Sequence, residues 1–253
     1  MEITHLVVAG CSWTYCQGLD DPKTQGWPAF LARKLEVPVV NLALPGLGND
    51  AIHRRTYEYF FQDLPNNSKP LYVIAWSQTW RREAWCRELY AGPTVKNKSG
   101  YSIIAMPDDM PQNNVEKALL DTWSEEDFYR KTMLARLSID SLFKSKNIPH
   151  ATSFFFDPEN EHTPPIRKKY QSIVDYLDNN TGLIRPYFYE VTSPYPNLPC
   201  GHEGYESMPV LADHVYDYLM KMYHEITPVT GKFMSLKEFD DVDTTGFVES
   251  VWK

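Results

Sequence analysis

The sequence has few cysteines, no long apolar run and no basic cluster at its start. Four cysteines in 253 residues, at positions 11, 16, 86 and 200, fit neither a zinc-binding spacing nor a disulfide scaffold, so we expect reduced thiols and no bound metal. No apolar run approaches the roughly 18 residues that a membrane helix needs. The first ten residues read as a strand and not as a signal peptide. These absences predict a cytoplasmic protein that does not bind membranes.

Positive charge is also scarce. The formal net charge is −8, whereas binding to a nucleic-acid backbone needs clustered Lys and Arg. Nucleic acid is therefore not an expected partner, although a small anionic substrate held by a few local arginines stays open. The sequence does not indicate an oligomeric state.

The length and composition are those of a globular protein. A chain of 253 residues with 43% hydrophobic residues can bury the core of one α/β domain. No internal repeat and no shift in composition divides it. We expect a single domain over residues 1–226, followed by an acidic extension over residues 227–253.

Short apolar runs alternate with amphipathic segments along the chain. Alternating strands and helices imply parallel pairing with right-handed crossovers. We therefore predict a three-layer α/β/α fold with a flavodoxin-like, parallel, five-stranded sheet. Between the third and fourth strands, residues 91–122 lose this periodicity, and we expect a surface excursion that covers the site. The expected strands are residues 5–9, 38–43, 71–76, 151–156 and, as a short fifth strand, 187–191.

Ser12 directly follows the first expected strand. His5 to Ala9 form an apolar run that Gly10 ends. Ligands in open α/β sheets bind at the carboxyl ends of strands, which makes Ser12 a candidate nucleophile. The structural alternative is that Ser12 caps the turn or a following helix. Cys11 is a second candidate nucleophile at the same turn.

A serine acyl-transfer enzyme also needs a base and donors for the oxyanion. Among the seven histidines, only His202 lies in a loop bounded by Gly and Pro just before the last expected helix. Taken alone, His202 is more simply interpreted as a structural residue at the start of the last helix, with its hydrogen bonds satisfied locally. The loops after the second and third strands offer oxyanion donors. These are Gly46 with Asn49, and Ser77 with Gln78.

The run SQTWRREAW after the third strand is the most distinctive local cluster. It predicts either a wall of the site, where an arginine binds a substrate carboxylate or phosphate in bidentate fashion, or a surface helix whose tryptophans pack inward. Arg82 is the preferred arginine because it follows Gln78 by four residues and would share its helical face.

Taken in order, these segments resemble the sequence blocks of the SGNH (GDSL-type) hydrolases. GCSWTYCQGL resembles the first block, with Ser12 at the nucleophile, and VVNLALPGLGND resembles the second, with Gly46 at the oxyanion-hole glycine. YVIAWSQTW occupies the place of the third block. GHEGYESMPVLADHVYDYL resembles the last block, with His202 at the base. The variant is similar to short SGNH-like proteins of tailed bacteriophages.

The resemblance implies an esterase that uses neither a metal nor a cofactor and acts on an acyl ester of a small polar molecule. Ser12 would attack and His202 would serve as base. The backbone N–H groups of Ser12 and Gly46, with a side-chain amide from Asn49 or Gln78, would stabilise the oxyanion. The residues expected to contact the substrate are Trp13, Ser77, Trp80 and Arg82.

Three positions depart from the blocks of the family. Cys11 stands at the Asp of the first block, Gln78 at the Asn of the third block, and Pro199 at the acid three residues before the histidine. His202 would therefore lack its usual orienting carboxylate, unless another acid such as Glu203 replaces it. Two alternatives stay open: a degenerate fold that binds a ligand or a protein without turnover, and a phosphoester or nucleotide hydrolase.

Overall fold

The computed structural model describes residues 1–79, 81–85, 101–104, 124–158 and 164–229. Within these ranges the chain forms a four-stranded parallel sheet in the order β3-β2-β4-β7. An isolated parallel bridge between Thr152 and Leu183 adds a fifth position beside β7. This is the 2-1-3-4-5 order of flavodoxin-like folds, so the predicted α/β class with a parallel sheet is confirmed. The strands are β2 (His5–Ala9), β3 (Val39–Asn41), β4 (Pro70–Trp76) and β7 (His150–Phe154).

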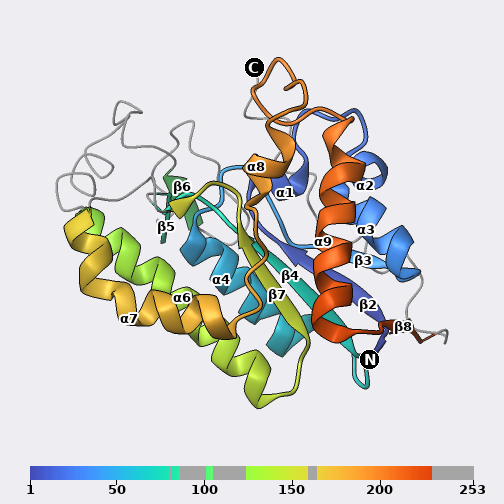
Figure 1. Ribbon diagram of the computed structural model, residues 1–253, viewed down its shortest axis with the longest axis horizontal. Coiled ribbons are helices and arrows are strands. Elements are labelled where there is room, and N and C mark those ends of the chain that lie inside the picture. The colour runs from blue at the N-terminus through green and yellow to red at the C-terminus, as the bar shows by residue number, and fades with distance from the viewer. Residues whose placement is uncertain (80, 86–100, 105–123, 159–163, 230–253) are drawn as a thin grey trace.

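Helices cover both faces of this sheet (Figure 1). On one face lie α4 (Asn49–Glu58), α6 (Glu125–Ser145) and α7 (Pro164–Asn180), and on the other lie α3 (Trp27–Leu35) and α9 (Ser207–Tyr223). None of the described helices is long and apolar enough to cross a membrane. Shorter helical segments are α1 (Ser12–Tyr15), α2 (Pro22–Gln25), the π-helix η1 (Tyr59–Asp63) and α8 (Phe188–Thr192).

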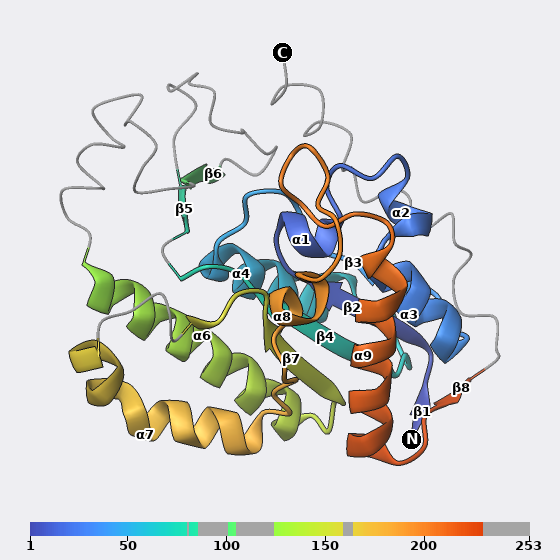
Figure 2. The ribbon, with the colours of Figure 1, turned by 45° about the horizontal axis from the view of Figure 1, so that its top comes forward.

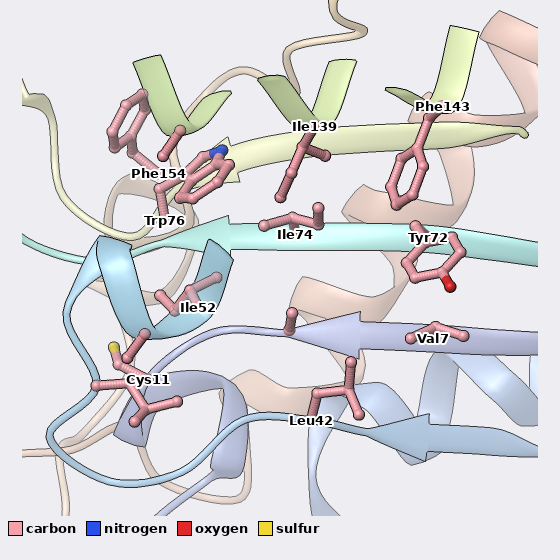
Figure 3. Packing of buried hydrophobic residues seen from close by; sticks show 14 of the residues in the cluster. Val7, Cys11, Leu42, Ile52, Tyr72, Ile74, Trp76, Ile139, Phe143 and Phe154 are labelled. Atoms are coloured by element: carbon pink, nitrogen blue, oxygen red, sulfur yellow. The ribbon is translucent and has the colours of Figure 1, made fainter. Parts of the chain in front are cut away.

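The two central strands bury both of their faces. Val7 and Ile74 belong to the core that α4 and α6 cover (Figure 3), whereas Val8 and Val73 belong to the core under α3 and α9. Every residue of β2 and β4 is buried. This burial explains why both strands appear in the sequence as continuous apolar runs and not as alternating patterns.

The segment 187–191 is helical, which corrects the expected fifth strand. α8 spans Phe188–Thr192, and Tyr187 is its N-cap residue. The Glu190 carboxylate accepts the backbone N–H of Tyr187 at 2.7 Å. The edge of the sheet is instead continued at Leu183. Strand propensity of the aromatic residues therefore lost to local capping.

Two small sheets, each of two strands, lie outside the central sheet. β1 (Glu2–Ile3) pairs in parallel with β8 (Thr227–Pro228), so the first residues of the expected C-terminal extension join the N-terminal segment. β5 (Arg82–Trp85) pairs antiparallel with β6 (Tyr101–Ile104). The rest of the excursion expected at 91–122, and residues 230–253, lie outside the described residues.

Candidate functional site

Ser12 lies where β2 ends, beside the end of β4. These two strands are neighbours in the sheet although β3 lies between them in the chain, and such a switch point is where doubly wound folds bind ligands. Ser12 is the first residue of α1 and is 4% exposed. Cys11, not Ser12, is the N-cap of α1. The Ser12 hydroxyl has no hydrogen bond to a described residue, so a capping role does not explain this serine.

Gly10 fixes the tight turn between β2 and Ser12. A Cβ atom at this position would lie 2.1 Å from Oγ1 of Thr14 and 3.1 Å from the carbonyl oxygen of Ala75. Only glycine lets α1 fold back this closely onto the end of β4. The turn therefore holds Ser12 against the switch point.

His202 contacts the residue next to Ser12. The ring centroids of His202 and Trp13 lie 4.4 Å apart, and Phe155 also stacks on Trp13 at 4.4 Å with an interplanar angle of 15°. The loop that carries His202 lies against the segment that follows α1 in both views of the ribbon (Figure 1 and Figure 2). At Gly18, whose φ is +96°, a Cβ atom would lie only 2.6 Å from Sγ of Cys200. The fold thus packs the loop of the expected base onto the segment of the expected nucleophile.

No described acid accompanies the His202 ring. Nδ1 of His202 is buried without a hydrogen-bond partner, and no ion pair joins the ring to a described carboxylate. Burial lowers the pKa of His202, the positive charge of Arg81 lowers it further, and the backbone of Cys200 acts in the opposite direction. The ring is therefore neutral near pH 7, as a general base must be.

Glu203 does not replace the missing acid. Its Oε1 accepts a hydrogen bond from Thr192 Oγ1 at 3.1 Å, and the residue is 4% exposed. Burial raises the pKa of the Cys16 thiol to about 12, and the Glu203 carboxylate contributes to that rise. Glu203 therefore faces Thr192 and Cys16 under the loop and makes no ion pair with His202.

The two candidate amides differ in their partners. Nδ2 of Asn49 donates to the Ser77 carbonyl at 3.0 Å and to Thr132 Oγ1 at 3.1 Å, while Oδ1 accepts the Ser77 N–H at 2.7 Å. Both donors of Asn49 are thus occupied in tying the loop after β4 to α4 and α6. Gln78 is half-buried, and its amide has no hydrogen bond to a described residue.

Two backbone donors remain available at neighbouring strand ends. Neither the Ser12 N–H nor the Gly46 N–H donates to a described residue. Gly46 has a φ of +80°, a conformation that favours glycine and turns the chain after β3. Together with Gln78 after β4, these donors occupy the carboxyl ends of three adjacent strands.

Among the described side chains, the arginine placed beside the site is Arg81. Nη1 of Arg81 donates to Ser77 Oγ at 3.4 Å, and its charge acts on His202. Residues 82–85 form strand β5, so Arg82 does not share a helical face with Gln78, and the expectation of helical spacing was wrong. The side chain of Arg82, and all of Trp80, lie outside the described residues.

Solved proteins with a similar backbone include several esterases. The psychrotrophic esterase EstA from Pseudoalteromonas sp., in a structure inhibited by monoethylphosphonate, superposes with a TM-score of 0.53 at 13% identity, covering 88% of this chain and 100% of that chain. This chain has the fold of that esterase. No protein-family model matches the sequence, and no curated protein matches it.

Two further structures are similar at lower scores. A member of the lipolytic protein G-D-S-L family from Veillonella parvula DSM 2008 has a TM-score of 0.47 at 10% identity, covering 85% of this chain and 97% of that chain. AlinE4, an SGNH-hydrolase family esterase, has a TM-score of 0.45 at 16% identity, and the match covers 79% of this chain and 89% of that chain. These structures give no support to a phage origin.

Cys11 is a core residue in the esterase-like fold. It is 1% exposed and lies among the apolar side chains under α4, near Ile52 (Figure 3). Its sulfur is therefore not presented as a nucleophile beside Ser12. Among the described residues, no group of three or more His, Cys, Asp or Glu side chains could hold a metal ion.

Truncating the side-chain amides of Gln78 and Asn49 should have different effects: one on the rate of catalysis and the other on the free energy of unfolding. Gln78→Ala should lower kcat by about 10²-fold with little change in the free energy of unfolding, because an oxyanion donor acts mainly in the transition state. Asn49→Ala should instead lower the free energy of unfolding by about 2 kcal/mol or more, because it leaves the buried Ser77 backbone groups unpaired. Esterase rates and urea denaturation of both variants measure this. A stable Asn49→Ala protein with a lowered kcat would reverse the assignment.

Glu203 should make the stability of the protein depend on pH. Burial raises the pKa of Glu203 from 4.5 to about 8. Between these two pKa values the folded state holds a proton that the unfolded state releases. The contribution of Glu203 to the free energy of unfolding is therefore fully present below about pH 4.5 and is lost as the pH rises toward about 8. Glu203→Gln should remove this decrease in the free energy of unfolding with pH, whose slope cannot exceed about 1.36 kcal/mol per pH unit. Urea denaturation at several pH values measures it, with Glu206→Gln as the exposed control. Identical pH profiles for wild type and Glu203→Gln would contradict the prediction.

Proposed function

We propose that this protein is a serine esterase that cleaves an acyl ester of a small polar molecule. The observation that carries the proposal is the placement of Ser12. Its hydroxyl has no described partner at the switch point of an esterase-like fold, and His202 packs on the adjacent Trp13. A serine retained only for structure would be expected to use its hydroxyl in a local hydrogen bond.

The reaction follows the logic of acyl transfer. Oγ of Ser12 attacks the ester carbonyl carbon, and His202 takes the hydroxyl proton through Nε2. The N–H groups of Ser12 and Gly46 and the amide of Gln78 donate to the oxyanion. When the bond to the leaving oxygen breaks, His202 returns the proton to the alcohol. Water then cleaves the acyl-enzyme by the same steps in reverse.

Trp13 takes over part of the role of the missing acid. The centroid of its indole ring lies 4.4 Å from that of the His202 ring, with the two planes tilted by 43°, so the indole restrains the imidazole and places its π system beside the imidazolium that forms during attack. Such a cation–π contact is worth about 0.5–2 kcal/mol. Losing the usual carboxylate costs about 10⁴-fold in turnover, or about 5 kcal/mol. Trp13 therefore compensates only in part, and we expect a slow esterase.

The second candidate function is a binding protein without turnover. It is favoured by the His202 ring itself, whose Nδ1 has no described partner and which lies near the positive charge of Arg81. Both features disfavour the imidazolium. Such a protein would keep the fold and the substrate contacts but would not activate Ser12.

A fluorophosphonate probe tests the proposal. The probe reacts with a serine only when a base activates its hydroxyl and the oxyanion site accepts the phosphoryl oxygen. Covalent labelling at Ser12 supports the esterase, whereas an intact protein that stays unlabelled favours the binding protein.

A further inference from the structure

Aromatic rings lead from the proposed base to the surface of the protein. The ring of Trp13 contacts that of His202, and the centroid of the Phe156 ring lies 5.5 Å from that of Trp13, with the two planes at 86°. The Tyr189 ring follows, with its centroid 5.2 Å from that of Phe156. Phe156 is half-buried, whereas Tyr189 is 42% exposed. These last two rings, here named the aromatic platform, are therefore partly open to solvent beside the site.

The backbone holds the aromatic platform at the edge of the sheet that carries Ser12. Phe156 comes two residues after the end of β7, which pairs in parallel with β4, the neighbour of β2. Phe156 and Ser12 therefore leave the sheet at the same, carboxyl, end. The N–H of Tyr189, in the first turn of α8, donates to the carbonyl oxygen of Phe155 at 2.8 Å. Because this bond ties both rings to one strand end, the platform is ordered before any ligand binds, which lowers the cost of binding.

The proposed reaction brings the alcohol part of a substrate to the same side. His202 returns a proton to the leaving alcohol oxygen, which must then lie within about 2.6–3.2 Å of the ring nitrogen. The alcohol part therefore begins at His202, and Trp13 and the aromatic platform are the next rings in the series. An isolated exposed aromatic residue needs no explanation, whereas a fixed pair that is continuous with the proposed base indicates a ligand-binding surface.

We propose that the alcohol of the substrate ester carries an aromatic ring, which binds to the aromatic platform. This inference rests on the proposed esterase function and deepens it by naming the substrate class. Aromatic rings pair in offset or edge-to-face geometry at centroid separations of about 4.5–7 Å, and such a pair contributes more than its buried area alone. A saturated ring of the same size buries a similar area but lacks the π quadrupole. The platform should therefore distinguish an aryl group from its saturated analogue.

Two matched acetates test the inference. We would compare kcat/KM for benzyl acetate and cyclohexylmethyl acetate, whose alcohols differ in the aromatic ring, by measuring the alcohol released. Wild type should prefer benzyl acetate by about 3- to 10-fold, the factor that corresponds to the extra contribution of an aromatic pair. Tyr189→Leu and Phe156→Leu keep apolar bulk but remove a ring, so each should reduce this preference toward unity while largely keeping kcat/KM for the saturated ester. Tyr189→Phe should keep the preference.

Tyr176→Leu is the matched control for these variants. Tyr176 is a similarly exposed tyrosine, at 45%, and it lies on α7. Its substitution should leave both rates unchanged. Urea denaturation shows whether each variant folds like wild type, and the more exposed Tyr189 carries the test should Phe156→Leu be unstable.

The outcomes separate the two proposals. If wild type hydrolyses both acetates with equal kcat/KM and Tyr189→Leu changes neither value, the aromatic-substrate inference is wrong and the esterase stands. A preference for benzyl acetate that survives both leucine variants would also overturn the inference, because the aryl group would then bind elsewhere. So would a preference for acetylcholine over benzyl acetate that Tyr189→Leu removes, because the rings would then bind a cation.

An inert wild type calls for a binding measurement. If wild type is as inert as Ser12→Ala on both acetates, the esterase is wrong, and NMR titration with benzyl acetate then decides whether the platform binds an aromatic ring. Weaker binding by Tyr189→Leu than by wild type and Tyr176→Leu would support an aromatic ligand. Equal binding by all three proteins would overturn it.

Discussion

Ser12→Ala is expected to abolish fluorophosphonate labelling and to lower the rate of hydrolysis of a small activated ester by about 10²-fold. Removing the nucleophile of a complete triad costs about 10⁶-fold in kcat, and a site without its acid has already lost about 10⁴-fold of that acceleration. The remaining loss is therefore about 10²-fold, and the residual rate is the one that the oxyanion site and substrate binding sustain without the nucleophile. Nitrophenol release from p-nitrophenyl acetate and the intact mass after labelling measure the two effects.

Ser193→Ala is the matched control for this variant. Ser193 is an exposed serine in the loop that leads toward His202, and its hydroxyl donates only to the Glu190 carbonyl, at 3.4 Å. It should label and turn over like wild type. Labelling of Ser12→Ala at the wild-type level would place the reactive hydroxyl elsewhere and would remove the main support for the proposed function.

Pro199→Asp is expected to raise turnover by up to about 10⁴-fold, the amount that a triad loses with its acid. The substitution restores a carboxylate three residues before His202, whose Nδ1 is buried and has no described partner. Pro199 is exposed in a turn that the Gly201 N–H closes onto the Leu198 carbonyl at 2.8 Å. Proline suits the second position of such a turn but is not required there, so the loop should fold with a stability loss below about 1 kcal/mol.

Three companion variants show the cause of any change in the turnover of Pro199→Asp. Pro199→Asn offers a similar shape without the charge, and Pro199→Ala reports the effect of a more flexible loop. Pro199→Asp combined with Ser12→Ala shows whether any gain uses Ser12. A gain that Pro199→Ala matches would come from the loop and not from a carboxylate. If wild type and Ser12→Ala are equally inert and Pro199→Asp gains nothing, the binding protein becomes the better proposal.

Much of the fold could be predicted because its signals are local. The apolar runs of β2 and β4 begin and end within two residues of the predicted strands, and Ser124 caps α6 through the Asp127 N–H, three residues along the chain. Ser12 could be singled out because a glycine ends the strand just before it. In each case, the residues that decide the structure lie within one turn or one strand of each other.

The errors arose where distant residues decide. Arg82 lies in a strand because β5 pairs with β6, whose residues come some twenty positions later in the chain. The partners of Asn49 were likewise not foreseen: its donors bind Ser77 and Thr132, which no spacing in the sequence connects with it. Periodicity and motif order carry no information about such pairings, so the sequence could indicate the members of the site but not their partners.

The stack of Trp13 on Phe155 links the chemistry of the site to the core of the protein. Phe155 is 1% exposed and belongs to the cluster under α3 and α9, while the ring of Trp13 also contacts that of His202. A substitution that repacks this cluster would therefore also displace the base. Natural selection for a stable fold and natural selection for turnover then act on the same aromatic residues, so a substitution at Trp13 or Phe155 changes stability and turnover together.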